Sequence, residues 1–150
     1  MKTIIQRVLQ ASVEVNKEVV GEISHGLLLL VGVEEADTSE DIDWLCRKIC
    51  NMRIFAEEEG NMNLSVKDVD GELLIVSQFT LHASTKKGNR PSFTKAAKPD
   101  FAESIYDKFK LKIAQELGKP IECGQFGADM KVSLLNDGPV TISIDSKNKK

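Results

Sequence analysis

The chain has 150 residues, of which 41% are hydrophobic and 29% are charged, and its formal net charge is −3. This length predicts a single domain, residues 1–150, that can bury a substantial hydrophobic core. The negative net charge argues against a protein that binds nucleic acid over its whole surface, because such proteins carry an excess of Lys and Arg. Any contact with RNA is therefore expected to be confined to a local patch.

No segment predicts a membrane span, since the longest apolar run, Leu27 to Val31, is far too short to cross a bilayer. The first residues contain no apolar segment typical of a secretory signal, so we expect a cytoplasmic protein without membrane contact. The three cysteines are an odd number, which argues against a secreted disulfide framework. Cys46 and Cys50 lack a nearby Cys or His pair that would complete a metal site, and we interpret them as buried helix residues.

The first part of the chain predicts three strands followed by a helix. The expected strands, which are rich in β-branched or leucine residues, are Ile4–Val15, Glu18–Ile23 and His25–Val33. The unbroken apolar run in the third is typical of a strand buried on both faces. Thr38 and Ser39 are favourable helix N-cap residues, and apolar residues recur at helical spacing from Ile42 to Met52. We expect this helix to end before Phe55 and the polar stretch Glu57–Asn63 to form a loop.

The second part predicts a strand, a long loop, a helix and two further strands. Their expected bounds are Glu72–Leu81, Ala83–Lys98, Pro99–Leu117, Met130–Leu135 and Val140–Ile144. Gly118 and Pro120 are expected to end the second helix. The last two strands flank Asn136-Asp137-Gly138-Pro139, where Asp-Gly favours a hairpin turn. Ser146–Lys150 is expected to be a frayed end. The order of elements predicts a mixed α/β fold, in which two main helices cover one side of a curled sheet.

Conventional catalytic motifs are absent from the sequence. His25 and His82 are the only histidines, and we interpret both as structural, with His82 partly exposed just past a strand end. Ser84 lies close to His82, but no nucleophile elbow surrounds it. Taken singly, the polar end of the strand at Ser77–Leu81 is explained by an edge-facing alternation, and the segment at 136–139 by a plain turn.

Together, two segments resemble a known family. Ser77-Gln78-Phe79-Thr80 resembles the S-Q-x-T motif of the D-aminoacyl-tRNA deacylases, and Asn136-Asp137-Gly138-Pro139-Val140-Thr141 resembles their N-x-G-P-x-T motif, in the same order and at a similar separation. The resemblance extends to Ile5–Val8, Gly26–Gly32 and Lys87–Phe93, and therefore covers nearly the whole chain. It implies a hydrolase that cleaves the ester bond of D-aminoacyl-tRNA in translation quality control.

The resemblance also implies a barrel-like sheet and a homodimer with its active site at the subunit interface. Gly138-Pro139 would be cis and would project into the pocket of the other subunit as a chiral gate, whose carbonyls accept from the substrate amino group and leave no room for an L side chain. Arg7 is expected to hold the orientation of this motif, unless it is a surface arginine of a strand. Asn136 and Thr141 complete the expected substrate-binding residues.

Ser77, Gln78, Phe79 and Thr80 are the expected catalytic residues. By resemblance, backbone amides near Phe79 and Thr80 bind the ester carbonyl, and the terminal 2′-hydroxyl of the tRNA assists attack by water. The side chain of Thr80 is then helpful but not indispensable, because the sequence offers no base to activate it. No metal or other cofactor is expected. Achiral glycyl-tRNA would pass the same gate and be a further substrate.

Contact with the 3′ acceptor end of tRNA is assigned to the loop 85–98, where Lys86, Lys87 and Arg90 lie among further lysines without any acidic residue. A solvated loop would have the same composition.

Two other functions remain open from the sequence. A related editing domain of some archaeal threonyl-tRNA synthetases removes L-serine, and a sister deacylase group has a relaxed gate. A non-catalytic RNA-binding or dimeric interaction module would also suit the lack of conventional catalytic groups.

Overall fold

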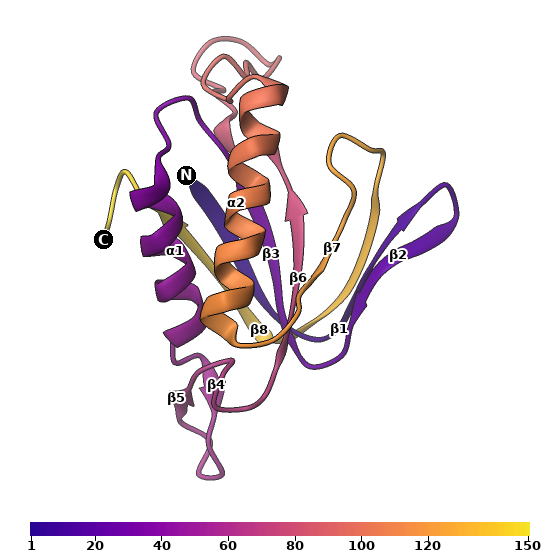
Figure 1. Ribbon diagram of the computed structural model, residues 1–150, viewed down its shortest axis with the longest axis vertical. Helices are drawn as coiled ribbons and strands as arrows, with labels where there is room; N and C mark the ends of the chain where they lie inside the picture. The colour runs from indigo at the N-terminus through magenta and orange to yellow at the C-terminus, as the bar shows by residue number, and fades with distance from the viewer.

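A long antiparallel pair of strands, β1 (Lys2–Val15) and β8 (Lys131–Asp145), runs through the middle of the fold. The computed structural model describes residues 1–150 as a curled sheet with two helices on one side (Figure 1). The other elements are β2 (Glu18–Ile23), β3 (Gly26–Gly32), α1 (Ser39–Asn51), β4 (Phe55–Ala56), β5 (Met62–Leu64), β6 (Glu72–Ser77), the 3-10 helix η1 (Phe79–His82), α2 (Pro99–Leu117) and β7 (Glu122–Cys123). No helix is both long and apolar enough to cross a membrane.

The sheet curls until its two edges meet. Its order is β2-β1-β3-β6-β7, and β8 pairs with β1 as well. At the edges, a Cβ on Gly21 of β2 would lie only 2.7 Å from the carbonyl oxygen of Cys123 in β7, so the backbones approach closely where no side chain intervenes. The backbone nitrogen of Glu22 also donates to the Glu122 carboxylate, at 3.4 Å. The result is the nearly closed, barrel-like sheet that the resemblance implied.

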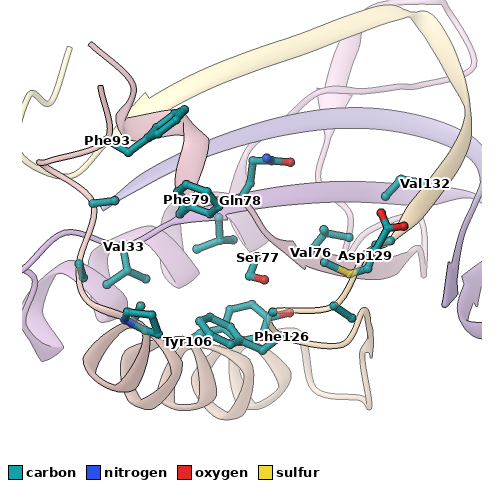
Figure 2. A pocket seen from close by; sticks show the side chains of 18 residues that line it. Val33, Val76, Ser77, Gln78, Phe79, Phe93, Tyr106, Phe126, Asp129 and Val132 are labelled. Atoms are coloured by element: carbon teal, nitrogen blue, oxygen red, sulfur yellow. The ribbon is translucent and has the colours of Figure 1, made fainter. Parts of the chain in front are cut away.

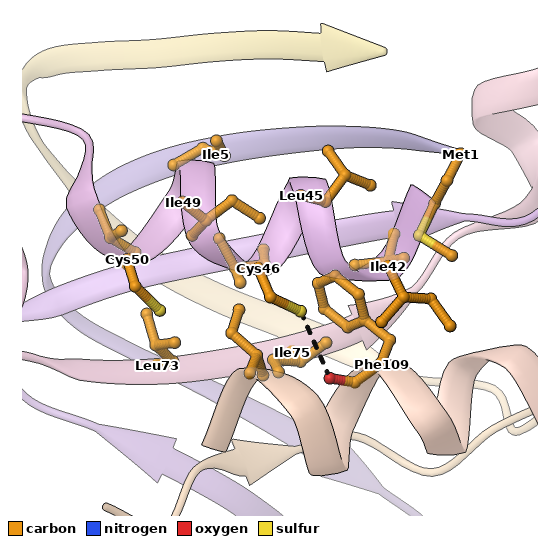
Figure 3. Close-up of a cluster of buried hydrophobic side chains, with 14 of the residues drawn as sticks. Met1, Ile5, Ile42, Leu45, Cys46, Ile49, Cys50, Leu73, Ile75 and Phe109 are labelled. Carbon is orange, nitrogen blue, oxygen red and sulfur yellow. Dashed lines mark hydrogen bonds between the residues drawn. The ribbon is translucent and has the colours of Figure 1, made fainter. Parts of the chain in front are cut away.

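Two apolar clusters lie on the two faces of this sheet. The larger one joins α1 and α2 to the face formed by Ile5, Leu27, Leu29, Leu73 and Ile75 (Figure 3). The smaller one fills the inside of the curl with residues such as Leu28 and Leu74. Because consecutive strand residues point to opposite faces, the unbroken apolar run of β3 supplies both clusters, as expected for a strand buried on both sides.

Helix α1 begins, and helix α2 begins and ends, at the residues that the sequence predicts. The hydroxyl of Thr38 accepts from the backbone nitrogen of Glu40, and Asp41 closes a capping box. Pro99 stands in the first turn of α2, and Gly118 ends that helix at φ +83°, which an L side chain disfavours. Cys46 and Cys50 are fully buried on α1, as interpreted, and the Cys46 thiol donates to the Phe109 carbonyl.

Three expectations about the elements were wrong. The strand predicted to reach Leu81 ends at Ser77, because the chain turns into η1, where the backbone nitrogen of Leu81 donates to the Gln78 carbonyl. The polar stretch 57–63, expected to be only a loop, ends in β5, which pairs with β4. The two final strands do not flank a hairpin: Gln6 pairs with Thr141 and Val8 with Asn136, so both halves belong to β8 and residues 137–140 bulge from its ladder with β1.

The C-terminal segment is not frayed, contrary to the sequence prediction. Ser146 is buried, and its hydroxyl accepts from the Met1 nitrogen at 2.8 Å. Lys147 donates to the Asp41 carboxylate at 2.9 Å, and Lys149 lies over the ring of Trp44. These contacts tie the segment to α1 and to the start of β1, which composition alone does not reveal. His82, expected to be partly exposed, is also buried, because η1 packs onto Gly32.

Candidate functional site at the end of β6

A hollow of about 560 Å³ opens where β6 ends and η1 begins. Ser77, Gln78 and Phe79 form one wall, and Tyr106 of α2 and Phe126 form the opposite one (Figure 2). Thirteen of its 18 lining residues are hydrophobic. A concave and mostly apolar cavity with a few polar groups at one edge is the usual form of a small-ligand site.

The backbone turns at Gln78, where β6 ends and η1 begins beside this hollow. Its own nitrogen donates to the Val31 carbonyl at 2.7 Å and thereby fixes the start of the turn to β3. The first hydrogen bond within η1 comes from Leu81, so the preceding N–H groups of Phe79 and Thr80 have no acceptor inside the helix. The Gln78 amide donates to the Thr80 hydroxyl across the same turn.

Aromatic side chains line much of the cavity. The Tyr106 hydroxyl donates to the Ile75 carbonyl at 3.1 Å, and burial raises the pKa of this phenol, so it remains a neutral wall of the cavity. Its ring lies 5.7 Å from that of Phe126. At the rim, Phe79 is 57% exposed and makes an edge-to-face contact with Phe93. Such flat apolar surfaces suit a nucleobase or an aromatic ring.

The second motif lies on β8. The Gly138–Pro139 peptide bond is cis, as the resemblance implied, and both residues are exposed. Gly138 has φ +126°, and a Cβ there would lie 2.9 Å from Val140 Cγ2 and 3.0 Å from Arg7 Nη2. Space and backbone conformation therefore both require glycine at this position.

Arg7 and Asn136 form hydrogen bonds to the backbone of this segment. The Arg7 Nε donates to the Asp137 carbonyl at 3.2 Å, and its Nη1 donates to the Ile54 carbonyl at 2.6 Å. The Asn136 amide donates to the Arg7 carbonyl at 2.9 Å and to the Val140 carbonyl at 3.1 Å, so it spans the base of the bulge. The Thr141 hydroxyl accepts from Gln6 at 3.3 Å.

The two motifs lie at different levels of the sheet within one chain. Ser77 is level with Val31 and Thr3, whereas Arg7 is level with Leu27 and Leu73. Four residues of strand separate these levels, or about 13 Å at ~3.3 Å per residue. The bulge at Gly138–Pro139 therefore does not line the hollow beside Ser77 in its own chain.

The basic loop follows η1 directly, at the top of Figure 1. Lys86, Lys87 and Arg90 are all exposed. Glu35 lies close to the end of the loop, where its carboxylate accepts from the backbone nitrogen of Lys98 at 2.8 Å. The sequence alone did not predict an acidic residue next to this loop.

Some residues of the hollow were not predicted as site residues from the sequence. Tyr106 and Phe126 are examples; Tyr106 lies beside the apolar stripe of α2, and Phe126 lies in a segment without a regular pattern. Tyr106 is the only tyrosine of the chain and lies next to a buried helix face. This was the one feature of the sequence that could have indicated a residue of the hollow.

The sequence matches the family described as D-Tyr-tRNA(Tyr) deacylase over residues 4–145. The chain belongs to this family. Membership confirms the resemblance carried by the two motifs, and with it the enzyme class, a hydrolase that acts on an ester bond.

Curated relatives match this sequence over nearly their full length. A protein of Flavobacterium johnsoniae named D-aminoacyl-tRNA deacylase is 64% identical over 149 residues, which cover 99% of each chain. A protein of the same name from Christiangramia forsetii is 63% identical over 150 residues and the whole of both chains.

Solved structures show the same fold. One described as c-Myc DNA Unwinding Element Binding Protein has a TM-score of 0.90 and 41% identity, and covers 97% of this chain and 98% of its own. Another, described as a probable eukaryotic D-amino acid tRNA deacylase, has a TM-score of 0.82 at 18% identity, with 95% and 97% coverage, and supports the fold alone.

Proposed function

We propose that this protein hydrolyses the ester bond of D-aminoacyl-tRNA, and that of glycyl-tRNA as well, and rejects L-aminoacyl-tRNA. The single observation that carries the proposal is the end of β6, where an aromatic hollow lined by Ser77, Gln78 and Phe79 adjoins the start of η1, whose Phe79 and Thr80 N–H groups have no acceptor inside the helix. The relatives that match the chain over its length are named for the same activity. The setting is translation quality control in the cytosol.

The hollow takes the terminal nucleoside of the acceptor end. Its volume of about 560 Å³ and its aromatic walls, Tyr106 and Phe126, suit an adenosine. The aminoacyl ester then lies at the rim, next to Ser77 and the turn at Gln78. Lys86, Lys87 and Arg90 contact phosphates further along the strand, which reconciles RNA binding with a net acidic chain.

Hydrolysis proceeds through main-chain stabilisation of charge. Water attacks the ester carbonyl carbon, and the N–H groups of Phe79 and Thr80 stabilise the negative oxygen of the tetrahedral intermediate. The intermediate collapses with loss of the ribose 3′-oxygen, and the neighbouring 2′-hydroxyl assists the proton transfers. An aminoacyl ester is already activated, so orientation supplies much of the remaining rate. No protein nucleophile or metal takes part in this scheme.

Selectivity comes from a second copy of the chain. Because Gly138 and Pro139 are exposed and lie about 13 Å along the strands from Ser77, one chain alone does not surround an ester with both motifs. Exposed leucines on the neighbouring strands, Leu9 and Leu135, each 50% exposed, offer an apolar surface for self-association beside the bulge. In a homodimer, the bulge of one subunit reaches the hollow of the other.

The carbonyls of Gly138 and Pro139 then accept from the substrate α-amino group. An L side chain would collide with this pair, whereas a D side chain points away from it. Glycine has no side chain to reject, so glycyl-tRNA is hydrolysed as well. Arg7 and Asn136 act as positioning residues, since their hydrogen bonds go to the segment itself.

The direct test is release of tyrosine from D-tyrosyl-tRNA and L-tyrosyl-tRNA in the presence of a chelator, with glycyl-tRNA as a third substrate. We expect rapid hydrolysis of the D-aminoacyl and glycyl esters and none of the L ester. Hydrolysis of both tyrosyl esters would support the proposed ester hydrolysis but contradict the proposed gate. Hydrolysis of no ester would leave an RNA-binding or interaction module.

Complementation tests the shared site. Gly138→Ala removes the gate, and Ala102→Phe obstructs the hollow of the same chain. In a mixed dimer the intact bulge of the Ala102→Phe chain faces the intact hollow of the Gly138→Ala chain. Mixing equal amounts of the two variants, with random subunit exchange, should therefore halve L-ester hydrolysis per Gly138→Ala chain and leave its D-ester hydrolysis unchanged. Unchanged L-ester hydrolysis, with mixed dimers verified by mass, would show that each chain's bulge acts on its own hollow.

A further inference from the structure

A second hollow, of about 370 Å³, lies on the other side of η1. Lys2 and Asp145 line it at the paired ends of β1 and β8, Trp44 lines it from α1, and Lys149 and Lys150 line it from the C-terminal segment. Nothing in the proposed chemistry at Ser77–Thr80 uses these residues. We call them, with Leu81, the Trp44 hollow.

The charge of this hollow favours an anion. Three of its residues, Lys2, Lys149 and Lys150, are cationic, and none of the three forms a salt bridge. Its one carboxylate side chain, Asp145, already accepts from the backbone nitrogen of Lys147 at 2.9 Å. A phosphate would therefore meet more positive than negative charge, although the protein as a whole carries −3.

Trp44 gives the hollow a flat wall between two cations. The Lys149 ammonium lies 5.0 Å and the Lys48 ammonium 5.7 Å from the centre of the Trp44 ring. An aromatic face beside ammonium groups is the arrangement by which proteins hold a nucleotide of a single strand, with the ring against the base or ribose and the cations on the phosphates.

The η1 helix separates the hollow from the candidate active site. Phe79 lines the first hollow and Leu81, two residues further on, lines the second, so a single turn of 3-10 helix separates them. Lys2 pairs with Gly32 at the same end of the sheet as Ser77. A strand of RNA whose terminal nucleoside fills the first hollow can cross η1 and enter the second.

We propose that the Trp44 hollow binds the sugar–phosphate backbone of the substrate tRNA near its acceptor end, on the side of η1 opposite to the loop 85–98. Lys2, Lys149 and Lys150 would contact phosphates, and Trp44 would stack on a ribose or base. This inference rests on the proposed function for the identity of the RNA. It makes the C-terminal segment part of the substrate-binding surface.

Trp44 is the only tryptophan of the chain, so its fluorescence reports on this hollow alone. We expect uncharged tRNA to change the emission of Trp44 in a saturable way. The 3′-O-D-tyrosyl ester of adenosine, which contains the terminal nucleoside alone, and 5′-AMP should leave it unchanged. Saturation by tRNA without any change of emission would overturn the proposal. A response to 5′-AMP as tight as that to tRNA would also overturn it, in favour of a free-nucleotide site.

Charge reversal provides the second test. K149E/K150E is compared with K67E/K108E, which has the same change of charge at two exposed lysines elsewhere. We expect K149E/K150E to lower kcat/KM for D-tyrosyl-tRNA roughly tenfold or more and to reduce the salt slope of log kcat/KM by about 2, one for each lost phosphate contact. Hydrolysis of the adenosine ester should be unaffected, and K67E/K108E should resemble the wild type.

The outcomes separate this inference from the proposed function. Equal loss on tRNA and on the adenosine ester would show that the C-terminal segment acts on the fold or the chemistry, and an unaffected tRNA rate would show that it binds no RNA. If the wild type hydrolyses neither ester, the proposed function fails. In that case the RNA surface is supported if K149E/K150E weakens the fluorescence response of Trp44 to uncharged tRNA, and contradicted if the response is unchanged.

Discussion

Arg7 binds Asp137 twice: its Nε lies 3.2 Å from the Asp137 carbonyl oxygen and 3.2 Å from the carboxylate oxygen Oδ2. The Arg7 side chain is only 12% exposed, and its Nη1 donates to Ile54 as well. One guanidinium therefore joins the bulge of β8 to the segment that follows α1. A planar group with several fixed donors can do this, whereas a lysine ammonium cannot reproduce the geometry.

Replacing Arg7 by Lys should impair selectivity more than folding. We expect R7K to release the segment 137–140 and to lower the ratio of kcat/KM for D- over L-tyrosyl-tRNA about tenfold or more, since hydrogen bonds of a charged group are worth roughly 1.5–3 kcal/mol each. Steady-state kinetics with the D and L esters measure this selectivity, and thermal unfolding measures the loss of stability. R53K, at an arginine without a salt bridge, is the matched control. Wild-type selectivity in R7K would remove Arg7 from the gate.

Gly138→Ala tests the gate itself. The new Cβ would meet Val140 and the Arg7 guanidinium at about 3 Å, at φ +126°. The backbone has to move, because an L residue held in such a conformation costs about 1–3 kcal/mol. We expect loss of discrimination between D- and L-tyrosyl-tRNA, seen as a smaller ratio of their kcat/KM values. If rejection of the L ester stays intact in a folded G138A protein, the gate hypothesis is wrong. Gly60→Ala, at φ +89° on an exposed loop, controls for the backbone effect.

Thr80→Val asks whether the hydroxyl is a nucleophile. Thr80 accepts a hydrogen bond from Gln78, and no His, Asp or Glu donates to or accepts from its hydroxyl. We expect T80V to retain deacylation within about tenfold of the wild type, because the backbone N–H remains available. A loss far beyond ~10⁴-fold, the range that acid–base assistance can supply, would indicate covalent catalysis. Rapid-quench analysis for an aminoacyl-enzyme gives an independent answer.

Asp41 links stability to pH. Burial alone would raise its pKa, but side-chain hydrogen bonds with Ser146 and Lys147 and the backbone of Thr38 outweigh burial and hold the pKa well below 3.8. A carboxyl whose folded pKa is depressed stabilises the fold above its unfolded pKa, and this contribution disappears as pH falls through the folded value. We expect D41N to lower the free energy of unfolding at pH 7 by about 1 kcal/mol, discounted because Lys147 is 38% exposed.

The difference between wild type and D41N should stay constant above about pH 5 and shrink below pH 3.8. Asp37 shifts the other way, since burial raises its pKa, but it is present in both proteins and largely cancels in the comparison. Urea titrations across pH measure the difference. D107N, which removes an exposed partner of Lys110, should show none. A gap that persists unchanged in acid would assign the effect to packing.

The basic loop gives a prediction that depends on ionic strength. K86A/K87A should raise KM for D-tyrosyl-tRNA and reduce its salt dependence, because each lost phosphate contact lowers the slope by about 1. The adenosine ester lacks these phosphates and should be hydrolysed as before. K67A/K108A removes the same charge from other exposed sites and should change neither substrate. An equal effect of both double variants would mean that only the total charge matters.

The sequence by itself determined the elements whose pattern is local. Three such patterns were predicted correctly: the apolar run of β3, the capping residues Thr38 and Gly118, and the helical spacing of apolar residues in α1 and α2. Each of them depends on side chains within a few residues of one another. The two motifs were also recognisable, because Ser77–Thr80 and Asn136–Thr141 are short contiguous segments. They indicated the family, which the comparisons confirm.

Only the tertiary structure decided how distant segments meet. Arg7 and Asp137 are 130 residues apart, and Trp44 meets Lys149 across most of the chain. Such contacts depend on strand register and on the curl of the sheet, which bring together residues that no local period relates. For the same reason β8 continues through Gly138 where Asp-Gly alone favours a turn: pairing with β1 on both sides of the bulge outweighs the local preference.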